Sequence, residues 1–201
     1  MVCLTINKYK VSALSIAILA FSSVGYADDV TDSINEGLQH YKNKEYGEAA
    51  QSLNYASQLI QQMKGKSLES LLPEPLSGWA AENAGSQAAG AAMFGGGISA
   101  ERQYHKDSSS INVQIVTDSP ILQSVMMMMT NPMFAMSDGG KMEKLSGQKA
   151  IVKYDSTSKR GDIKIVVVNR FLVTIEGNDV HKEDLEAYAK AIDYKKLASL
   201  P

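Results

Sequence analysis

The chain has 201 residues, a formal net charge of −2 and 21% charged residues. This length allows one sizeable domain or a pair of small ones, and the composition is that of an ordinary globular protein. Nothing in it suggests a nucleic-acid partner, which would require a clustered basic surface.

The first 27 residues have the pattern of a secretory signal peptide. Two lysines precede a short apolar stretch over residues 11–24, and Gly25-Tyr26-Ala27 places small residues at the −3 and −1 positions of a cleavage site. We therefore expect residues 1–27 to be removed, so that the mature protein starts at Asp28. A transmembrane anchor is the alternative interpretation, but the apolar stretch is short for a membrane span.

Cysteine occurs at one position, Cys3, within the predicted signal peptide. Because Cys3 precedes the apolar stretch instead of lying at the cleavage site, a lipoprotein signal is not expected. The mature chain would therefore hold no disulfide, no thiolate metal site and no cysteine nucleophile. A signal peptide on a cysteine-free chain indicates a periplasmic or secreted bacterial protein.

Residues 28–70 have the spacing of two helices joined by a short turn. Ile34, Leu38 and Tyr41 share one face of the first helix, and the second carries apolar residues at helical spacing over residues 49–63. Two interpretations remain open. The hairpin is an ordinary packed part of the fold, or it presents a small binding surface to a protein partner.

Part of this hairpin resembles a single tetratricopeptide helix hairpin. The positions that carry the resemblance are Gly37, Tyr46, Ala49, Leu53 and Ala56. It covers one repeat only, and such repeats bury their faces by stacking on neighbours, so a solenoid is not expected.

Two prolines and a glycine break the helical pattern over residues 71–79, which we interpret as a linker. Trp79 is expected to pack in the core of the next unit, an α+β sandwich domain over residues 80–201. Residues 80–94 are rich in alanine, which predicts a helix, and Gly95-Gly96-Gly97 predicts its end and a flexible joint. The glycines lack the lysine and hydroxyl residues of a phosphate-binding loop, so no nucleotide site is expected.

Further strands and helices are predicted after the glycines. Two pairs of strands alternate in hydrophobicity, and Ser119 and Pro120 mark the start of a helix between them. A closing helix is predicted to start near Asp179, with Glu183 and Asp184 in its first turn. The predicted strands cover residues 99–105, 111–117, 141–145 and 148–154.

The most apolar part of the mature chain predicts a central β-hairpin, with strands over residues 162–168 and 171–176 and the turn at Asn169-Arg170. A turn of two residues pairs Val168 with Phe171. Near the turn both faces of this hairpin are apolar. It therefore needs helices on both faces, which predicts a central position in the sheet.

These elements predict an α+β fold with a mostly antiparallel sheet sandwiched by helices and an N-terminal helical hairpin. Gly78-Trp79, the helix after the second strand, and Asn169-Arg170-Phe171 before the last helix resemble the PsbP-like fold. That resemblance implies an accessory role in a secreted or lumenal protein. The whole chain is also similar to a secreted proteobacterial family of unknown function. Neither resemblance supplies catalytic residues.

Catalytic and metal-binding patterns are absent from the sequence. The three histidines, His40, His105 and His181, form no i, i+4 pair with one another like that of a zinc helix. His181 and Asp184, three residues apart, are interpreted as a solvated helix start. There is no Gly-x-Ser-x-Gly motif of a hydrolase serine. Carboxylates that meet only in the fold keep a hydrolase possible, and no cofactor is predicted.

A methionine-rich region is the least ordinary part of the sequence. Its side chains suit three uses: core packing, an adaptable surface for an apolar ligand or partner, or thioether ligands for Cu(I). The candidate surface comprises Met126, Met127, Met128, Met129, Met133, Met93 and Phe94.

Helical geometry predicts how the methionines are arranged. Leu122, Met126 and Met129 can share one face, so that Met127 and Met128 point largely away from it. We expect the alanine-rich segment to form a mobile apolar cover over the latter two.

The function expected from the sequence is that of a non-catalytic periplasmic binding or accessory protein. It would engage a protein partner or an apolar ligand through its helical hairpin or its Met-rich region. The alternatives are a Cu(I)-binding periplasmic protein and a hydrolase without a sequence signature. No membrane-spanning segment is expected in the mature chain.

Overall fold

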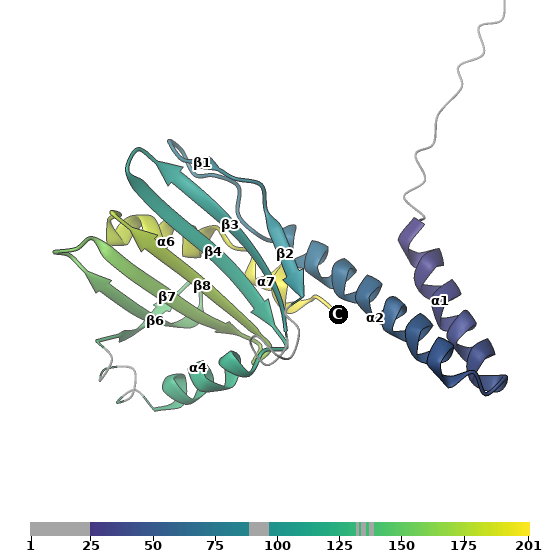
Figure 1. Ribbon diagram of the computed structural model, residues 1–201. Coiled ribbons are helices and arrows are strands. Elements are labelled where there is room, and N and C mark those ends of the chain that lie inside the picture. Colours follow the sequence, from purple (N-terminus) through teal and green to yellow (C-terminus); the bar gives the residue numbers. More distant parts are fainter. Residues whose placement is uncertain (1–24, 89–96, 132, 134–135, 137–138) are drawn as a thin grey trace, which may run out of the picture.

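The computed structural model describes residues 25–88, 97–131, 133, 136 and 139–201. It has the predicted α+β architecture, with an antiparallel sheet, helices on its faces and a helical hairpin before it (Figure 1). The helices are α1 (Gly25–Lys42), α2 (Tyr46–Glu69), α4 (Pro120–Thr130), α6 (Lys182–Ala191) and α7 (Tyr194–Ala198). The strands are β1 (Ala80–Ala81), β2 (Gly85–Ala88), β3 (Ile98–Lys106), β4 (Ser109–Thr117), β5 (Lys141–Leu145), β6 (Gln148–Asp155), β7 (Arg160–Val167) and β8 (Phe171–Asn178).

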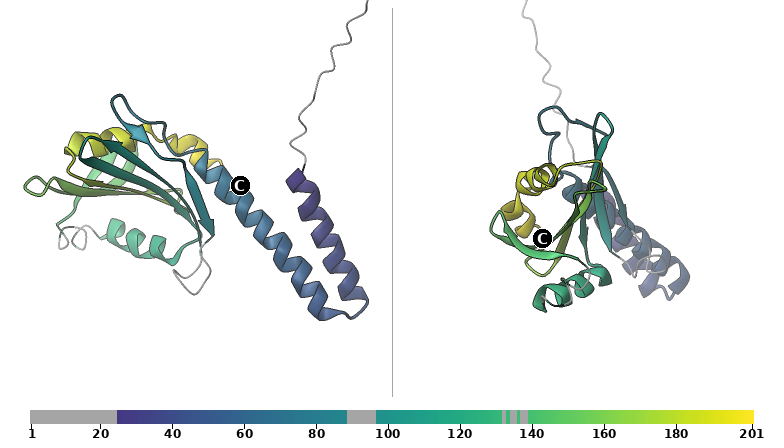
Figure 2. Two further views of the ribbon diagram at one scale, coloured as in Figure 1. Left: turned by 45° about the horizontal axis from the view of Figure 1, so that its top comes forward. Right: turned by 90° about the vertical axis from the view of Figure 1, so that its left-hand side faces the viewer.

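The helical hairpin of α1 and α2 extends from one end of the sheet domain, as Figures 1 and 2 show. The two helices cross closely at Gly37, where an added Cβ would lie 2.9 Å from Cγ of Leu53. Helix α1 begins at Gly25, three residues before the predicted mature start at Asp28. At the other end of the hairpin, Leu68 of α2 is buried in the core of the sheet domain.

The central β-hairpin lies at the centre of the sheet, as predicted. The strand order is β1-β3-β4-β8-β7-β6-β5, and β2 pairs with β3 outside this path. Every neighbouring pair in the described sheet is antiparallel. Strands β7 and β8 therefore have a neighbour on both sides, which matches their apolar composition.

The predicted register of this hairpin is wrong by one residue. Val167, and not Val168, pairs with Phe171. Val168 and Asn169 have φ values of 46° and 54°, and the Arg170 N–H donates to the Val167 carbonyl at 3.0 Å. These are the features of a tight turn with positive φ at both central residues, followed by one extra residue. The shift keeps Val167 in the core and leaves Val168 exposed, although a β-branched residue is strained at positive φ.

The alanine-rich segment is not helical where the structure describes it, so the predicted helix over residues 80–94 is wrong over residues 80–88. This part forms β1 and β2, which pair with β3. An added Cβ on Gly65 of α2 would lie 2.7 Å from Oγ of Ser86 in β2. The small residues thus allow α2 to lie directly on β2, and this tertiary contact prevails over the helical propensity of alanine.

Helix α4 starts where the sequence predicted, and helix α6 starts later. Ser119 is the N-cap of α4, where its side chain accepts a hydrogen bond from the Ile121 N–H at 3.3 Å, as predicted. Helix α6 starts at Lys182, later than expected. The reason is Asp179, which has a φ of 54° and accepts hydrogen bonds from Ser108 in the β3–β4 turn and from Ser109 at the start of β4. It therefore ends the β8 segment instead of opening a helix.

Apolar side chains form two clusters on opposite faces of the sheet. In β8, Phe171 and Val173 belong to the main core under α6 and α7, whereas Leu172 between them faces α4. This alternation is that of a strand covered on both sides. The end-on view in Figure 2 shows the C-terminal helices and α4 on different sides of the sheet. The second cluster consists of Leu122, Val125, Ile151 and Leu172, with partly buried Met126, Met128, Met129, Met142 and Val166.

The segment between α2 and β1, predicted as a linker, is packed against the domain. Its Pro73 carbonyl accepts hydrogen bonds from the Tyr104 hydroxyl at 2.6 Å and from Arg102 at 3.2 Å. Trp79 packs against the main core, as predicted. Its ring lies edge to face with that of Tyr188, with 5.5 Å between the ring centres. These contacts join the hairpin firmly to the sheet.

Of the helices that the structure describes, none is both long enough and apolar enough to span a membrane.

Candidate functional site

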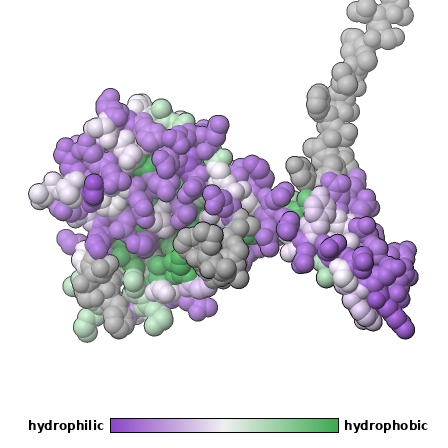
Figure 3. All heavy atoms as spheres, viewed as in Figure 1, coloured by the Kyte–Doolittle hydropathy of each residue, from purple (hydrophilic) through white to green (hydrophobic). Residues whose placement is uncertain are grey.

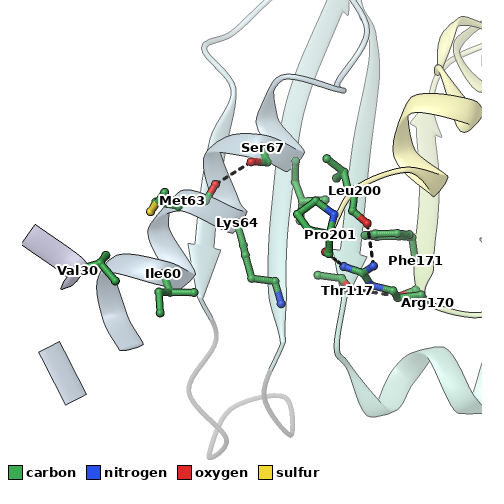
Figure 4. A pocket seen from close by; sticks show the side chains of 11 residues that line it. Val30, Ile60, Met63, Lys64, Ser67, Thr117, Arg170, Phe171, Leu200 and Pro201 are labelled. Carbon is green, nitrogen blue, oxygen red and sulfur yellow. Dashed lines mark hydrogen bonds between the residues drawn. The ribbon is translucent and has the colours of Figure 1, made fainter. Parts of the chain in front are cut away.

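A cavity of about 390 Å³ lies where the helical hairpin meets the end of the sheet (Figure 4). We call it the junction cavity. It is lined by residues from both helices of the hairpin, from the ends of β4 and β8, and from the last residues of the chain. They are Val30, Ile60, Met63, Lys64, Ser67, Leu68, Thr117, Arg170, Phe171, Leu200 and Pro201.

One wall of the junction cavity comes from a single face of α2. Ile60, Met63, Lys64 and Ser67 stand at positions i, i+3, i+4 and i+7, which a helix brings to one side. Figure 4 shows these side chains along the helix, with Lys64 extending toward the strands. The spacing that makes α2 amphipathic therefore also builds this wall.

The opposite wall comes from the start of β8 and the adjacent end of β4. Thr117 pairs with Phe171 across the two strands, and its hydroxyl donates to the Arg170 carbonyl at 3.3 Å. The Arg170 guanidinium lies 4.7 Å from the centre of the Phe171 ring. It also donates to the carbonyls of Leu200, at 2.9 Å, and Pro201. Arg170 thus holds the last residues of the chain against the cavity.

The charged side chains that line the junction cavity are basic. Its described lining contains two cationic side chains, Lys64 and Arg170, and no Asp or Glu side chain. The Lys64 ammonium is 2.7 Å from a carboxylate oxygen of Asp118, which lies outside the lining. Lys64 has three N–H donors and Arg170 has five, so each keeps donors beyond those that its present partners accept. The cavity can therefore accept an anionic group beside its apolar walls.

The methionines of α4 are divided between a packed and an exposed set. Met126, Met128 and Met129 are partly buried against the second apolar cluster, and Met127 is 67% exposed. The prediction that both Met127 and Met128 point away from the buried face is confirmed for Met127 and wrong for Met128. The buried stripe is centred on Leu122 and Val125, and Met128 follows Val125 by three residues, which puts it on the same face.

Of the remaining candidate surface residues, Met133 follows the end of α4. Met133 is exposed, as is Met136, whereas Met93 and Phe94 lie outside the described residues. Figure 3 shows hydrophobic side chains gathered on the sheet domain beside α4. The predicted helical cover over Met127 and Met128 is not formed by residues 80–88, since these are strands paired with β3.

The rings of His40 and His105 each contact a glutamate. His40 is 2.6 Å from Glu45 at the tip of the hairpin, and His105 is 2.9 Å from Glu82. The backbone N–H of His181 donates to the Asp184 carboxylate at 3.2 Å, which confirms that this pair lies at a helix start. No group of three or more His, Cys, Asp or Glu side chains suited to a metal ion occurs within the part of the chain that the structure covers.

Sequence reasoning did not find the junction cavity. Its walls are more than a hundred residues apart in sequence, from Val30 to Pro201, and no motif links them. One sequence feature that pointed to a site here was Arg170, a charged residue beside the most apolar stretch of the mature chain. The apolar face predicted for the hairpin helices was a second signal, because more large side chains lie there than a two-helix contact can cover.

Comparison with known proteins gave no match to a protein-family model, a curated protein or a solved structure. The resemblance to the PsbP-like fold therefore stays a prediction.

Proposed function

We propose that this chain is a non-catalytic periplasmic binding protein that holds an apolar ligand with an anionic end in the junction cavity. The observation that carries the proposal is the lining, in which seven apolar residues stand beside two cationic side chains and no Asp or Glu side chain. A volume of about 390 Å³ suits a small organic molecule, since such sites commonly measure about 300–1,000 Å³.

Each part of the lining has its own role in this proposal. The apolar residues, among them Met63 and Phe171, remove the body of the ligand from water, which contributes about 25 cal/mol per Å² buried. Lys64 and Arg170 stand on facing walls and offer N–H donors to the anionic end. Thr117 and Ser67 add hydroxyl groups at the same site.

A dye that joins an apolar ring to a sulfonate, anilinonaphthalene sulfonate, tests the site directly. Ser67→Phe puts a large side chain into the cavity from the exposed surface of α2, so we expect about a tenfold or greater loss of dye affinity. Gln58→Phe makes the same kind of change on exposed surface of the same helix, away from the cavity, and should leave the affinity unchanged. Equal effects of the two variants would count against the site.

The anionic end is tested separately with Lys64→Gln. This change removes a positive charge from one wall, so the sulfonate dye should bind several-fold more weakly. Nile red, which is apolar and uncharged, should bind as before. If both dyes lose affinity to the same extent, Lys64 acts through the shape of the cavity and the proposed anion preference is wrong.

Export is part of the proposal and rests on the sequence of residues 1–27. The expected result is a mature protein in the periplasmic fraction whose first residue is Asp28, read by N-terminal sequencing. A chain found there with residues 1–27 still attached would contradict the predicted cleavage.

Copper binding is the second candidate, and the exposure of Met127, Met133 and Met136 favours it. Thioether sulfur is a soft ligand that suits Cu(I). Changing the three residues together to leucine keeps the apolar volume but removes the sulfurs. If copper is the ligand, Cu(I) should bind stoichiometrically in competition with a chelator, and this triple variant should lose the binding.

A further inference from the structure

One side of the helical hairpin carries a row of large apolar side chains that no described part of the chain covers fully. We call it the apolar row. Its members keep between 42% and 63% of their surface exposed. They are Ile34, Leu38 and Tyr41 from α1, and Tyr46, Leu53 and Ile60 from α2.

Helical spacing and contacts place these residues on the same side of the hairpin. The α1 members follow one another at i, i+4 and i+7, and the α2 members at intervals of seven. The two sets meet at the tip, where the rings of Tyr41 and Tyr46 are 5.9 Å apart. Further along, Leu53 packs against Gly37 of α1. The row therefore runs along the seam between the helices.

The other side of the seam is acidic. Asp29, Asp32 and Glu36 of α1 line a shallow depression together with Tyr55 of α2. The Glu36 carboxylate accepts a hydrogen bond from Ser52 of α2 at 3.1 Å, which fixes this as the side facing away from the row. The hairpin thus has one apolar and one negatively charged side.

We infer that the apolar row binds the apolar row of a second copy of this chain, so that the two hairpins form a four-helix bundle about a two-fold axis. A two-fold interface places the same surface on both partners. On the acidic side this would bring carboxylates against carboxylates. Along the row it brings apolar side chains together. Ala50, Ser57 and Gln61, which border the row on α2, carry no charge, and Lys64, four residues after Ile60, is paired with Asp118.

The size of the row supports a second copy as the occupant. A whole large side chain has about 200 Å² of surface, and about half of each member is exposed. The six members together therefore offer roughly 600 Å² of exposed surface per chain. A stable interface of ordinary size buries about 800 Å² on each partner, so the row supplies most of that area before its polar border is added. The inference is independent of the cavity, since of the six residues only Ile60 also lines it.

The test measures mass in solution by sedimentation over a wide range of concentration, with protein expressed from the full 201-residue sequence. The wild type should be a dimer. Leu38→Glu combined with Leu53→Glu puts charges into the row and should weaken dimerisation by about a hundredfold or more, because unpaired charges would be buried. Tyr55→Glu, a change on the acidic side of the same helix pair, should remain dimeric.

A covalent readout makes the result independent of how the double variant folds. Leu38→Cys introduces a thiol into a chain whose mature part is predicted to hold none, and a flexible bis-maleimide should join two copies of the dimer at this position. Tyr55→Cys should not be joined. The inference is overturned if the wild type is monomeric, if larger open-ended assemblies form, or if the Tyr55 variants show the effects expected of the row.

Discussion

Val167 and Val168 are neighbours with opposite surroundings. Val167 is 1% exposed in the main core, whereas Val168 is 60% exposed in the turn, at a φ of 46°. Val167→Asp would bury an unpaired charge and should lower the free energy of unfolding by several kcal/mol. Val168→Asp should change it by less than about 0.5 kcal/mol or raise it, because aspartate tolerates positive φ better than valine. Urea unfolding of both variants checks the prediction.

The comparison also tests the register of the central hairpin. A turn confined to Asn169-Arg170 would place Val168 in a strand opposite Phe171. In that case Val168→Asp would be as damaging as Val167→Asp, and the observed pairing of Val167 with Phe171 would be wrong.

His40 and Glu45 form a tight ionic contact at the tip of the hairpin, with Nδ1 and Oε2 2.6 Å apart. The hydrogen bond to Glu45 raises the pKa of His40 above its ordinary value of 6.5, and the same bond lowers the pKa of Glu45 below 4.5. The His40 contribution to stability is therefore complete below pH 6.5 and is lost as the pH rises through the raised pKa. The Glu45 contribution is complete above pH 4.5 and is lost as the pH falls through the lowered pKa.

An NMR titration of His40 measures this effect. Glu45→Gln should bring the pKa of His40 down toward its ordinary value, because the largest cause of the shift is removed. Glu48→Gln removes only a weaker and more distant charge, so it should change the pKa of His40 much less. If the two variants had equal effects, the general negative charge of the hairpin, and not the hydrogen bond, would control the titration.

At the scale of elements, the crossing of α2 over β2 depends on a glycine. An added Cβ at Gly65 would come within 2.7 Å of Oγ and 3.0 Å of Cβ of Ser86, whereas Gly47 on the same helix has open space around it. Gly47→Ala should stabilise the protein by up to about 1 kcal/mol through helix propensity. Gly65→Ala should be destabilising, since overpacking costs about 1–3 kcal/mol and exceeds that gain. Thermal unfolding of both variants separates the gain in helix propensity from the cost of overpacking.

A matched rescue completes this test. Ser86→Gly removes the side chain that an alanine at residue 65 would meet, so the double variant Gly65→Ala, Ser86→Gly should recover part of the lost stability. Stabilisation by Gly65→Ala alone would mean that α2 does not lie on β2.

For the whole molecule, the hairpin and the sheet domain share one core. Leu68, near the end of α2, is 1% exposed among residues of the sheet and of α6 and α7, and Leu71 and Leu72 follow it there. Lys64 and Asp118 add an ion pair between the two parts. Residues 28–70 and 80–201 should therefore unfold as one cooperative unit.

Leu68→Ala tests this cooperativity. It should cost about 2–5 kcal/mol, as for other buried leucines. The helical signal in circular dichroism and the fluorescence of Trp79 should lose their native values in one coincident transition. Leu38→Ala, at an exposed position of the hairpin, should cost much less. Separate transitions for the two signals would show that the hairpin is an independent unit.

The sequence by itself determined the fold class and most of the elements of the described chain. The helical hairpin, the start of α4 at Ser119 and Pro120, and the antiparallel pairs are each specified by signals within a few residues. N-caps, turns and hydrophobic periodicity act locally, so they can be read without the fold. The central position of β7 and β8 could also be predicted, because a strand that is apolar on both faces needs cover on both.

The tertiary structure alone decided three further features. The alanine-rich segment became strand, because α2 can approach β2 only over small residues and β3 supplies the hydrogen bonds. The hairpin register shifted by one residue, because burial of Val167 outweighed strain at Val168. The junction cavity formed because Val30, α2, Arg170 and the last residues converge. No local signal records such a meeting of distant segments, since its free energy arises only when the packed surfaces are brought together.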